Sequence, residues 1–322
     1  MILTVTINPL LERRLRFKSF EPGNVNRTNH EYFYAGGKGI NVSRQLNKFG
    51  LKNLAITFLG GHNGKNYRNV LTNENINFIV ISTKSETRIA TLIEEEDNKR
   101  ITTFIGSNSE ISKKESDDFK TKLEKVIQNC SIVIFSGSSP STYTDDIFPY
   151  GIELANKYDK ISILDTYGRH FKDCIASEPT VIHNNVNELE SSLNHGMSTE
   201  DEKLHFLKSL YSQNIKMGFI GDGAKPMYAS KFDFHYKIIP PKIEALDATG
   251  SGDAFVAGLT YGMEKALVFE DFSKTATVLG ALNATKWDAC NVDIENLEEY
   301  KNLVRVEPLG KKMKLIDDTA RF

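Results

Sequence analysis

The chain contains little cysteine, no excess of charge of either sign and no long apolar run. Its three cysteines, Cys130, Cys174 and Cys290, lie far apart without CxxC spacing, which argues against a disulfide framework and a cysteine zinc site. We expect them to be small packing residues. Forty Lys and Arg against 42 Asp and Glu give a formal net charge of −2, so no global field attracts nucleic acid or an anionic membrane. An anionic ligand must be held by local positive groups.

No window reaches the roughly 18 apolar residues of a membrane span. The first residues, MILTVTINP, lack the basic start of a signal peptide. We therefore expect a cytoplasmic protein with no membrane partner. Of the 322 residues, 40% are hydrophobic and 25% charged, as in ordinary globular proteins. This length fits one large α/β domain or a large domain with a small appendage.

Short β-rich apolar runs alternate with stretches of helical spacing. The expected strands are residues 2–7, 53–61, 131–137, 161–166, 180–185 and 217–223. In residues 113–129 and 200–214 the apolar residues fall three or four apart, which predicts helices. The repeated order of strand and helix predicts an α/β fold with a largely parallel sheet covered by helices on both faces.

One region breaks this alternation. Residues 87–106 hold two strand-like runs around the charged turn EEEDNKR, with no helix between them, which predicts an antiparallel hairpin. Together with residues 13–20 and 30–37, the hairpin predicts a small β-sheet separate from the main one. Such a sheet is either a lid over a site or a plain extension of the fold, and periodicity does not distinguish the two.

Glycines precede a helix in DATGSGDAFVAG, residues 247–258. Gly250, Ser251 and Gly252 stand before a run whose apolar members are four apart, so a helix should begin near Gly252. Unpaired amides at a helix start attract an anion, and glycine lets the anion approach. Asp253 would lie in the first turn as an ionised proton acceptor. The simpler interpretation is a tight turn with a capping acid. The G-x-G-x-x-G template fails here because residue 255 is Phe, and GGKG at 36–39 lacks the Ser or Thr that follows Lys in G-x-x-x-x-G-K-[ST].

A second glycine-fronted helix start is AGGKGINVSRQLNKFG, residues 35–50, with Lys38 and Asn41 at its mouth. Two such starts indicate two anionic or polyhydroxylated ligands. GGKGIN and DATGSGDAFVAG together resemble motifs of the ribokinase-type PfkB carbohydrate kinases. Other motifs, including TRIATLI, SGSSP and NVNELE, follow in that family's order over nearly the whole chain. They are most similar to the sugar-phosphate branch, which contains tagatose-6-phosphate kinases and 1-phosphofructokinases.

The resemblance implies a ribokinase-like, doubly wound domain over residues 1–322. Its small β lid is discontinuous, from about residues 10–36 and 86–106, and in this family often mediates dimerisation. The implied reaction is ATP- and Mg²⁺-dependent phosphorylation of a ketohexose phosphate to a bisphosphate. Two alternatives stay open: a kinase for a neutral sugar or a nucleoside, and a sugar-phosphate sensor that has lost turnover.

The resemblance also implies roles for individual residues. Asp253 is expected to be the catalytic base, beside an anion hole of Gly250, Ser251 and Gly252. The sugar-phosphate residues are expected to be Glu12, Arg27, Gly37, Lys38, Asn41, Arg88 and Ser138. The nucleotide residues are expected to be Asn185, Gly221, Gly223 and Asn283, and Asn185 and Glu188 are expected to hold Mg²⁺ through water. Without the resemblance, Asn41, Asn185 and Glu188 are helix-capping residues and Arg88 is an exposed strand charge.

Four positions depart from the family pattern. Glu12 stands where Asp is usual, and the extra methylene moves the carboxylate by roughly 1.5 Å. Residues 104–112 lack the usual Gly-Pro, His183 and Asn184 replace Lys-Pro, and GDG at 221–223 is tighter than G-x-x-G. These changes leave Asp253 untouched and bear on which sugar fits and how ATP binds.

Overall fold

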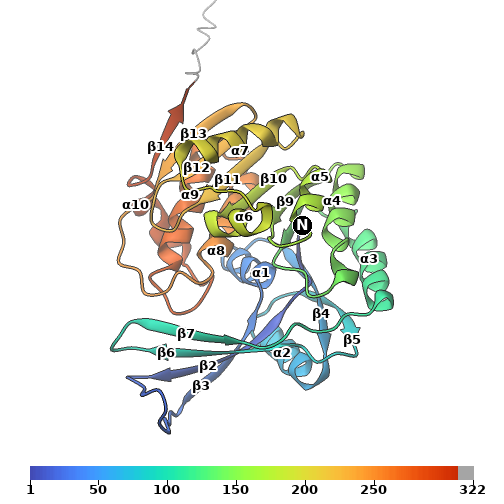
Figure 1. Cartoon of the computed structure of the whole chain (residues 1–322), viewed down its shortest axis with the longest axis vertical. Coiled ribbons are helices and arrows are strands. Elements are labelled where there is room, and N and C mark those ends of the chain that lie inside the picture. Colours follow the sequence, from blue (N-terminus) through green and yellow to red (C-terminus); the bar gives the residue numbers. More distant parts are fainter. Residues whose placement is uncertain (311–322) are drawn as a thin grey trace, which may run out of the picture.

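The computed structural model describes residues 1–310 as a large β-sheet flanked by helices and a small β-sheet at one end (Figure 1). Residues 311–322 of the predicted domain lie outside the described residues. The strands of the large sheet are β1 Ile2–Thr6, β4 Asn53–Gly60, β5 Phe78–Thr83, β8 Ile132–Ser136, β9 Ile161–Asp165, β10 Val181–Asn185, β11 Met217–Gly221, β12 Met227–Lys231, β13 Phe234–Ile239 and β14 Arg305–Leu309.

The large sheet has the strand order β14-β13-β12-β11-β10-β9-β8-β1-β4-β5. From β11 to β5 all neighbours are parallel, whereas β12, β13 and β14 add an antiparallel edge. The prediction of a largely parallel sheet is therefore confirmed, and all six predicted strands are present.

Helices cover both faces of this sheet, as predicted. They are α1 Lys38–Lys48, α2 Gly61–Asn73, α3 Lys113–Ile127, α4 Ile147–Lys157, α5 Phe171–Ala176, α6 Val186–Leu193, α7 Glu200–Ser212, α8 Ser251–Glu264, α9 Phe269–Asn283 and α10 Leu297–Lys301. In β1, Leu3 and Val5 pack with residues of α3 and α4, whereas Ile2 packs with residues of α8 and α9. This alternation is the reason that a parallel strand buried on both faces is apolar throughout. Within residues 1–310, no helix is long and apolar enough to cross a bilayer.

The small sheet is separate from the large one, as predicted. Its strands are β2 Leu10–Phe17, β3 His30–Gly36, β6 Ile89–Glu95 and β7 Arg100–Ile105, in the order β3-β2-β6-β7. Figure 1 shows it at the lower end of the molecule, beside α2. The register places Glu12 beside Ala90 and Ala90 beside Ile105. Because side chains alternate along a strand, these three residues share one face and their sequence neighbours point to the other.

A third apolar cluster joins the two sheets at the base of β2 and β3. It contains Leu11, Ala35, Leu59 and Tyr67, and the Tyr67 hydroxyl donates a hydrogen bond to the Gly36 carbonyl at 2.6 Å. The three cysteines are buried and free, which confirms their expected packing role.

Candidate active site

A cavity of about 1160 Å³ lies between the small sheet and the large domain. It is lined by β2, β6 and β7 on one side and by residues of α1, β10, α8 and α9 on the other. This volume exceeds that of an ordinary single-ligand pocket, so two ligands fit together. All the predicted site residues line the cavity except Arg27 and Asn283.

The glycine turn at 250–252 forms one wall. Helix α8 begins at Ser251, and Gly250 before it has a left-handed φ of 78°. A Cβ at Gly250 would lie 2.7 Å from the Ala289 Cβ, so both the conformation and the space require glycine. Contrary to expectation the Ser251 amide is occupied, because it donates to the Ala248 carbonyl at 3.1 Å. Among residues 1–310, the amides of Gly250, Gly252 and Asp253 have no protein acceptor, which leaves them open to an anion.

Asp253 is buried, with 4% of its surface exposed, and lines the cavity. Its Oδ2 accepts a hydrogen bond from Asn41 Nδ2 at 2.8 Å. Burial raises the pKa of Asp253 to about 7, and the Lys38 charge opposes this rise. A pKa near neutrality suits a general base.

Asn41 is fixed in orientation by a residue that the sequence reasoning missed. Arg44 Nη1 donates to Asn41 Oδ1 at 2.7 Å, so Asn41 must present its amide nitrogen to Asp253. Arg44 also donates to Glu74 and to the Ala35 carbonyl. Helix α1 has no side-chain cap, so the interpretation of Asn41 as a capping residue is wrong. The sequence signal that could have identified Arg44 is its position three residues after Asn41 on the same predicted helix.

Lys38 pairs with two carboxylates at the centre of the cavity. Its Nζ lies 2.6 Å from Glu188 Oε1 and 3.2 Å from Asp165 Oδ1. Burial lowers the pKa of Lys38, but the charges of Asp165 and Glu188 outweigh this and hold the pKa above its ordinary value. A phosphate bound by Lys38 must therefore share it with these acids. Asp165 ends β9 and had no predicted role.

His183, also missed, lies against the glycine turn. Its Nδ1 is 3.2 Å from Asp165 Oδ1, and its ring stacks on Phe255 with 4.8 Å between ring centroids. A Cβ at Gly252 would lie 3.2 Å from His183 Cε1. The imidazole thus occupies the space beside the open amides, at the position where the family pattern has lysine.

Arg88 provides a positive charge with no acidic partner among residues 1–310. It donates to the carbonyls of Asn8 and Pro9 and to Asn108 Oδ1, at 3.0, 3.3 and 2.9 Å. Burial lowers the pKa of Arg88 from its ordinary value, which leaves an arginine charged. Its side chain is partly buried and lines the cavity, so the interpretation as an exposed strand charge is wrong. Ser138, whose Oγ accepts from Asn8 Nδ2 at 3.0 Å, completes a polar corner.

Two predicted residues lie outside the cavity. Arg27 is exposed in the segment between β2 and β3 and does not line the cavity within one chain. Asn283 is buried, and its side chain donates to the Thr249 carbonyl at 2.8 Å and accepts from the Cys290 amide at 2.6 Å. Asn283 therefore braces the glycine turn, and its side chain does not line the cavity. Gly280 and Ala281 of the same helix line the cavity instead.

Residues 6–296 match the family model of the pfkB family carbohydrate kinases. The chain belongs to this family. A tagatose-6-phosphate kinase of Staphylococcus epidermidis is 30% identical over 312 residues, which cover 95% of this chain and 99% of the relative. A 1-phosphofructokinase of Borreliella burgdorferi is 30% identical over 314 residues, with 96% and 99% covered.

A solved structure of a possible 1-phosphofructokinase from Thermotoga maritima shares the fold. Its TM-score is 0.86 at 24% identity, with 96% of this chain and 99% of the other covered. The protein is therefore a PfkB carbohydrate kinase with the ribokinase-like fold, and membership of the family implies that it uses ATP.

The expected magnesium residues of this PfkB kinase cap a helix and also line the cavity. Asn185 Oδ1 accepts from the Glu188 amide at 2.9 Å, and Glu188 Oε2 accepts from the Asn185 amide at 3.1 Å. The capping interpretation is thus confirmed. Within residues 1–310, no cluster of three or more His, Cys, Asp or Glu is arranged to hold a metal ion. One carboxylate and one amide oxygen fit Mg²⁺ only if water and nucleotide phosphates supply the other ligands.

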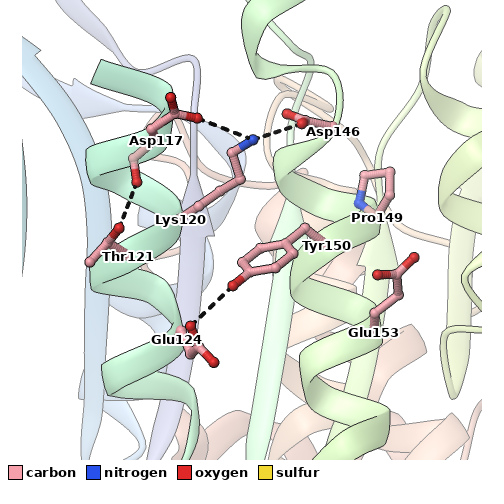
Figure 2. A pocket seen from close by; sticks show the side chains of 8 residues that line it. All are labelled: Asp117, Lys120, Thr121, Glu124, Asp146, Pro149, Tyr150 and Glu153. Atoms are coloured by element: carbon pink, nitrogen blue, oxygen red, sulfur yellow. Dashed lines mark hydrogen bonds and ion pairs between the residues drawn. The ribbon is translucent and has the colours of Figure 1, made fainter. Parts of the chain in front are cut away.

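A second hollow lies between α3 and α4 (Figure 2). Lys120 there points toward Asp117 and Asp146, with its Nζ 2.7 Å from Asp146 Oδ2, and Tyr150 donates to Glu124 at 3.2 Å. No predicted site residue lines it. The chemistry of the kinase therefore belongs to the first cavity.

Proposed function

We propose that this kinase transfers the γ-phosphoryl group of ATP to a free hydroxyl of a ketohexose phosphate, giving a bisphosphate. The observation that carries the sugar-phosphate part is Arg88, a partly buried cation of the cavity without an acidic partner in residues 1–310. A neutral sugar offers such a cation only uncharged acceptors, whereas a phosphate accepts stronger hydrogen bonds in which both partners are charged.

The proposed reaction uses Asp253 as the base. As the sugar oxygen bonds to the γ-phosphorus, the bond from phosphorus to the β–γ bridging oxygen breaks and ADP leaves. The hydroxyl proton passes to Asp253, because a sugar hydroxyl is too weak an acid to ionise beforehand. The open amides of Gly250, Gly252 and Asp253 are placed to stabilise the negative charge on the moving phosphoryl group.

The nucleotide is proposed to lie at the other end of the cavity. Gly221, Gly223, Gly280 and Ala281 line the cavity and themselves add little or no side chain to its wall. Asn185 and Glu188 would hold Mg²⁺ through water, and the ion would neutralise charge on the phosphates. Asn185 pairs with Gly221 in the register of β10 and β11, and Glu188 contacts Lys38, whose charge acts on Asp253, which supports this assignment.

An ADP-release assay tests the substrate class. The acceptors are tagatose 6-phosphate, fructose 1-phosphate and fructose 6-phosphate, with fructose and ribose as neutral sugars. We expect kcat/KM for at least one sugar phosphate to exceed that for both neutral sugars by 100-fold or more. A preference for fructose or ribose would support the neutral-sugar alternative. Tight sugar-phosphate binding by calorimetry without any turnover would support the sensor.

Arg88→Ala is expected to raise KM for the sugar phosphate by roughly 10- to 100-fold, since a charge-assisted hydrogen bond contributes about 1.5–3 kcal/mol. KM for ATP should stay within about twofold. The control is Arg305→Ala, which removes an equal charge from an exposed pair with Glu307 on β14, outside the cavity. Equal effects of the two variants would contradict the assignment of Arg88.

We also propose that two chains associate through the small sheet. Phe33 and Phe104 lie in one row with Arg13 and Thr91, on the face turned away from the cavity. They are 42% and 58% exposed. Exposed aromatic residues on a sheet face are typical of an interface between subunits.

A further inference from the structure

One arginine of the small sheet is almost completely buried. Arg14 on β2 is 1% exposed, which is rare for a charged side chain unless partners compensate it. It has two acidic partners: Nε and Nη2 donate to Glu12 Oε2 at 2.9 and 2.8 Å, and Nη1 lies 3.3 Å from Glu94 Oε1. Nη1 also donates to the Trp287 carbonyl at 2.6 Å, which belongs to the large domain.

The first consequence concerns the acid that faces the sugar end of the cavity. Because Arg14 occupies Glu12 Oε2 with two donors, Oε1 is the oxygen left to accept a hydroxyl. A Cβ at Gly36 would lie 2.5 Å from Glu12 Oε1, so glycine leaves room for the longer acid. Arg14 and Gly36 together thus set where the Glu12 carboxylate lies.

The second consequence concerns the segment that contains Trp287. Ala289 packs against Gly250, and the Cys290 amide donates to Asn283, which braces the same turn. The Tyr34 hydroxyl of the small sheet donates to Asp288 Oδ1 at 2.8 Å. Residues 287–290 therefore contact the small sheet on one side and the glycine turn on the other.

We propose that Arg14 is a positioning residue with two roles: it aims Glu12 at the acceptor sugar, and it fastens the small sheet to residues 287–290 behind the glycine turn. The proposal rests on the proposed function for its first role only. When the small sheet moves away, the bond to the Trp287 carbonyl breaks, while the charge of Arg14 stays compensated by Glu12 and Glu94. The guanidinium of Arg14 thus links sugar binding to the position of the open amides.

The test compares Arg14→Lys with Arg16→Lys. Arg16 also lies on β2 and also pairs with Glu94, at 2.8 Å, but contacts neither Glu12 nor Trp287. Lysine keeps the charge, so the buried acids stay compensated, but one ammonium cannot replace the fork of contacts that Arg14 makes. For Arg14→Lys we expect KM for the sugar phosphate to rise about tenfold or more and KM for ATP to change less than twofold.

A second measurement does not depend on turnover. Hydrogen exchange at the amides of residues 287–290 should be at least about tenfold faster in Arg14→Lys, and unchanged in Arg16→Lys. Faster exchange in Arg14→Lys alone supports the fastening role even if no sugar is phosphorylated, so the two proposals can fail separately. Equal exchange and equal kinetic parameters in both variants would overturn the proposal, because Arg14 would then only stabilise the small sheet.

Discussion

Asp253 combines burial with the negative charge that its proposed role as the base requires. Its carboxylate has one hydrogen-bond donor, Asn41, and lies near the acids Asp165 and Glu188. Burial and the two nearby acids disfavour ionisation of Asp253 and so raise its pKa, whereas Lys38 and Asn41 lower the pKa. The balance is what gives a carboxylate a proton affinity useful at neutral pH.

The pH dependence of activity follows from this balance. Only the carboxylate form of Asp253 accepts a proton, so kcat/KM should rise with pH along a limb centred near the pKa of about 7. Asn41→Ala removes a hydrogen bond that favours the charged form, and should move the limb to higher pH. Fructose serves as the control acceptor because it has no phosphate that titrates. A limb centred below pH 5 would contradict the assignment of the base.

The same raised pKa has a cost in stability. The unfolded carboxyl ionises near pH 3.8 and the folded one near pH 7, so the free energy of unfolding falls between these values, by at most about 1.4 kcal/mol per pH unit. Asp253→Asn should nearly abolish turnover while sparing binding. It should also be more stable than wild type, by a margin that grows from pH 4 to 7 and then stays constant. Melting temperatures across this range measure it, and a margin that shrinks with pH would contradict the sign.

The residues that sequence reasoning could predict are those within continuous motifs. Asp253 and its glycines, or Lys38 and Asn41, stand together in a few residues with helical spacing after them. Asp165 and His183 come from different strands and meet only because parallel strands end at the same edge of the sheet. The contacts of Asn283 with the glycine turn could not be predicted, because a position on a helix does not tell which neighbour its side chain contacts.

At the scale of single elements, the start of α6 allows the capping role of Asn185 to be tested separately from its proposed role in ligand binding. Asn185 caps α6 in the same way as Ser112 caps α3, each in a reciprocal capping box with a glutamate. Asn185→Ala and Ser112→Ala should therefore each lower the free energy of unfolding by about 1 kcal/mol. Only Asn185→Ala should also raise KM for Mg·ATP, because Ser112 does not line the cavity. If KM for Mg·ATP is unchanged in Asn185→Ala, the role of Asn185 is limited to capping the helix.

Elements with a strong local pattern were predicted, and those that depend on the tertiary fold were not. The hairpin over residues 87–106 was predicted because two β-rich runs flank a charged turn. Helix α2 was not predicted, because its sequence GHNGKNYRNVLTN has few apolar residues. Its buried residues are Gly64, Tyr67 and Leu71. The antiparallel edge of β12, β13 and β14 also needs the large sheet to define it.

At the scale of the whole molecule, the exposed row on the small sheet predicts association. Phe104→Arg should weaken a dimer by placing a charge in its interface, and light scattering would detect the shift toward monomer. The control is Val268→Arg, which changes a similarly exposed apolar residue, 66% exposed, on the large domain. A wild-type protein that is monomeric at all accessible concentrations would contradict the proposal.

The two-sheet architecture was foreseen because each sheet has its own sequence rhythm. The way in which the two sheets face each other could not be predicted, since contacts such as that of Tyr34 with Asp288 join residues 254 positions apart. Such contacts depend on the final packing, which local patterns do not specify.

The cavity-lining residues Glu12, Ala90, Leu92 and Ile105 belong to the small sheet, whereas Asp253 and the open amides belong to the large domain. Part of the proposed sugar site is thus carried on backbone separate from the proposed machinery of transfer. Chimeras that exchange residues 10–36 and 86–106 between related kinases would then change the sugar preference without rebuilding that machinery. Such exchanges would succeed only where the grafted strands still make the hydrogen bond to the Trp287 carbonyl.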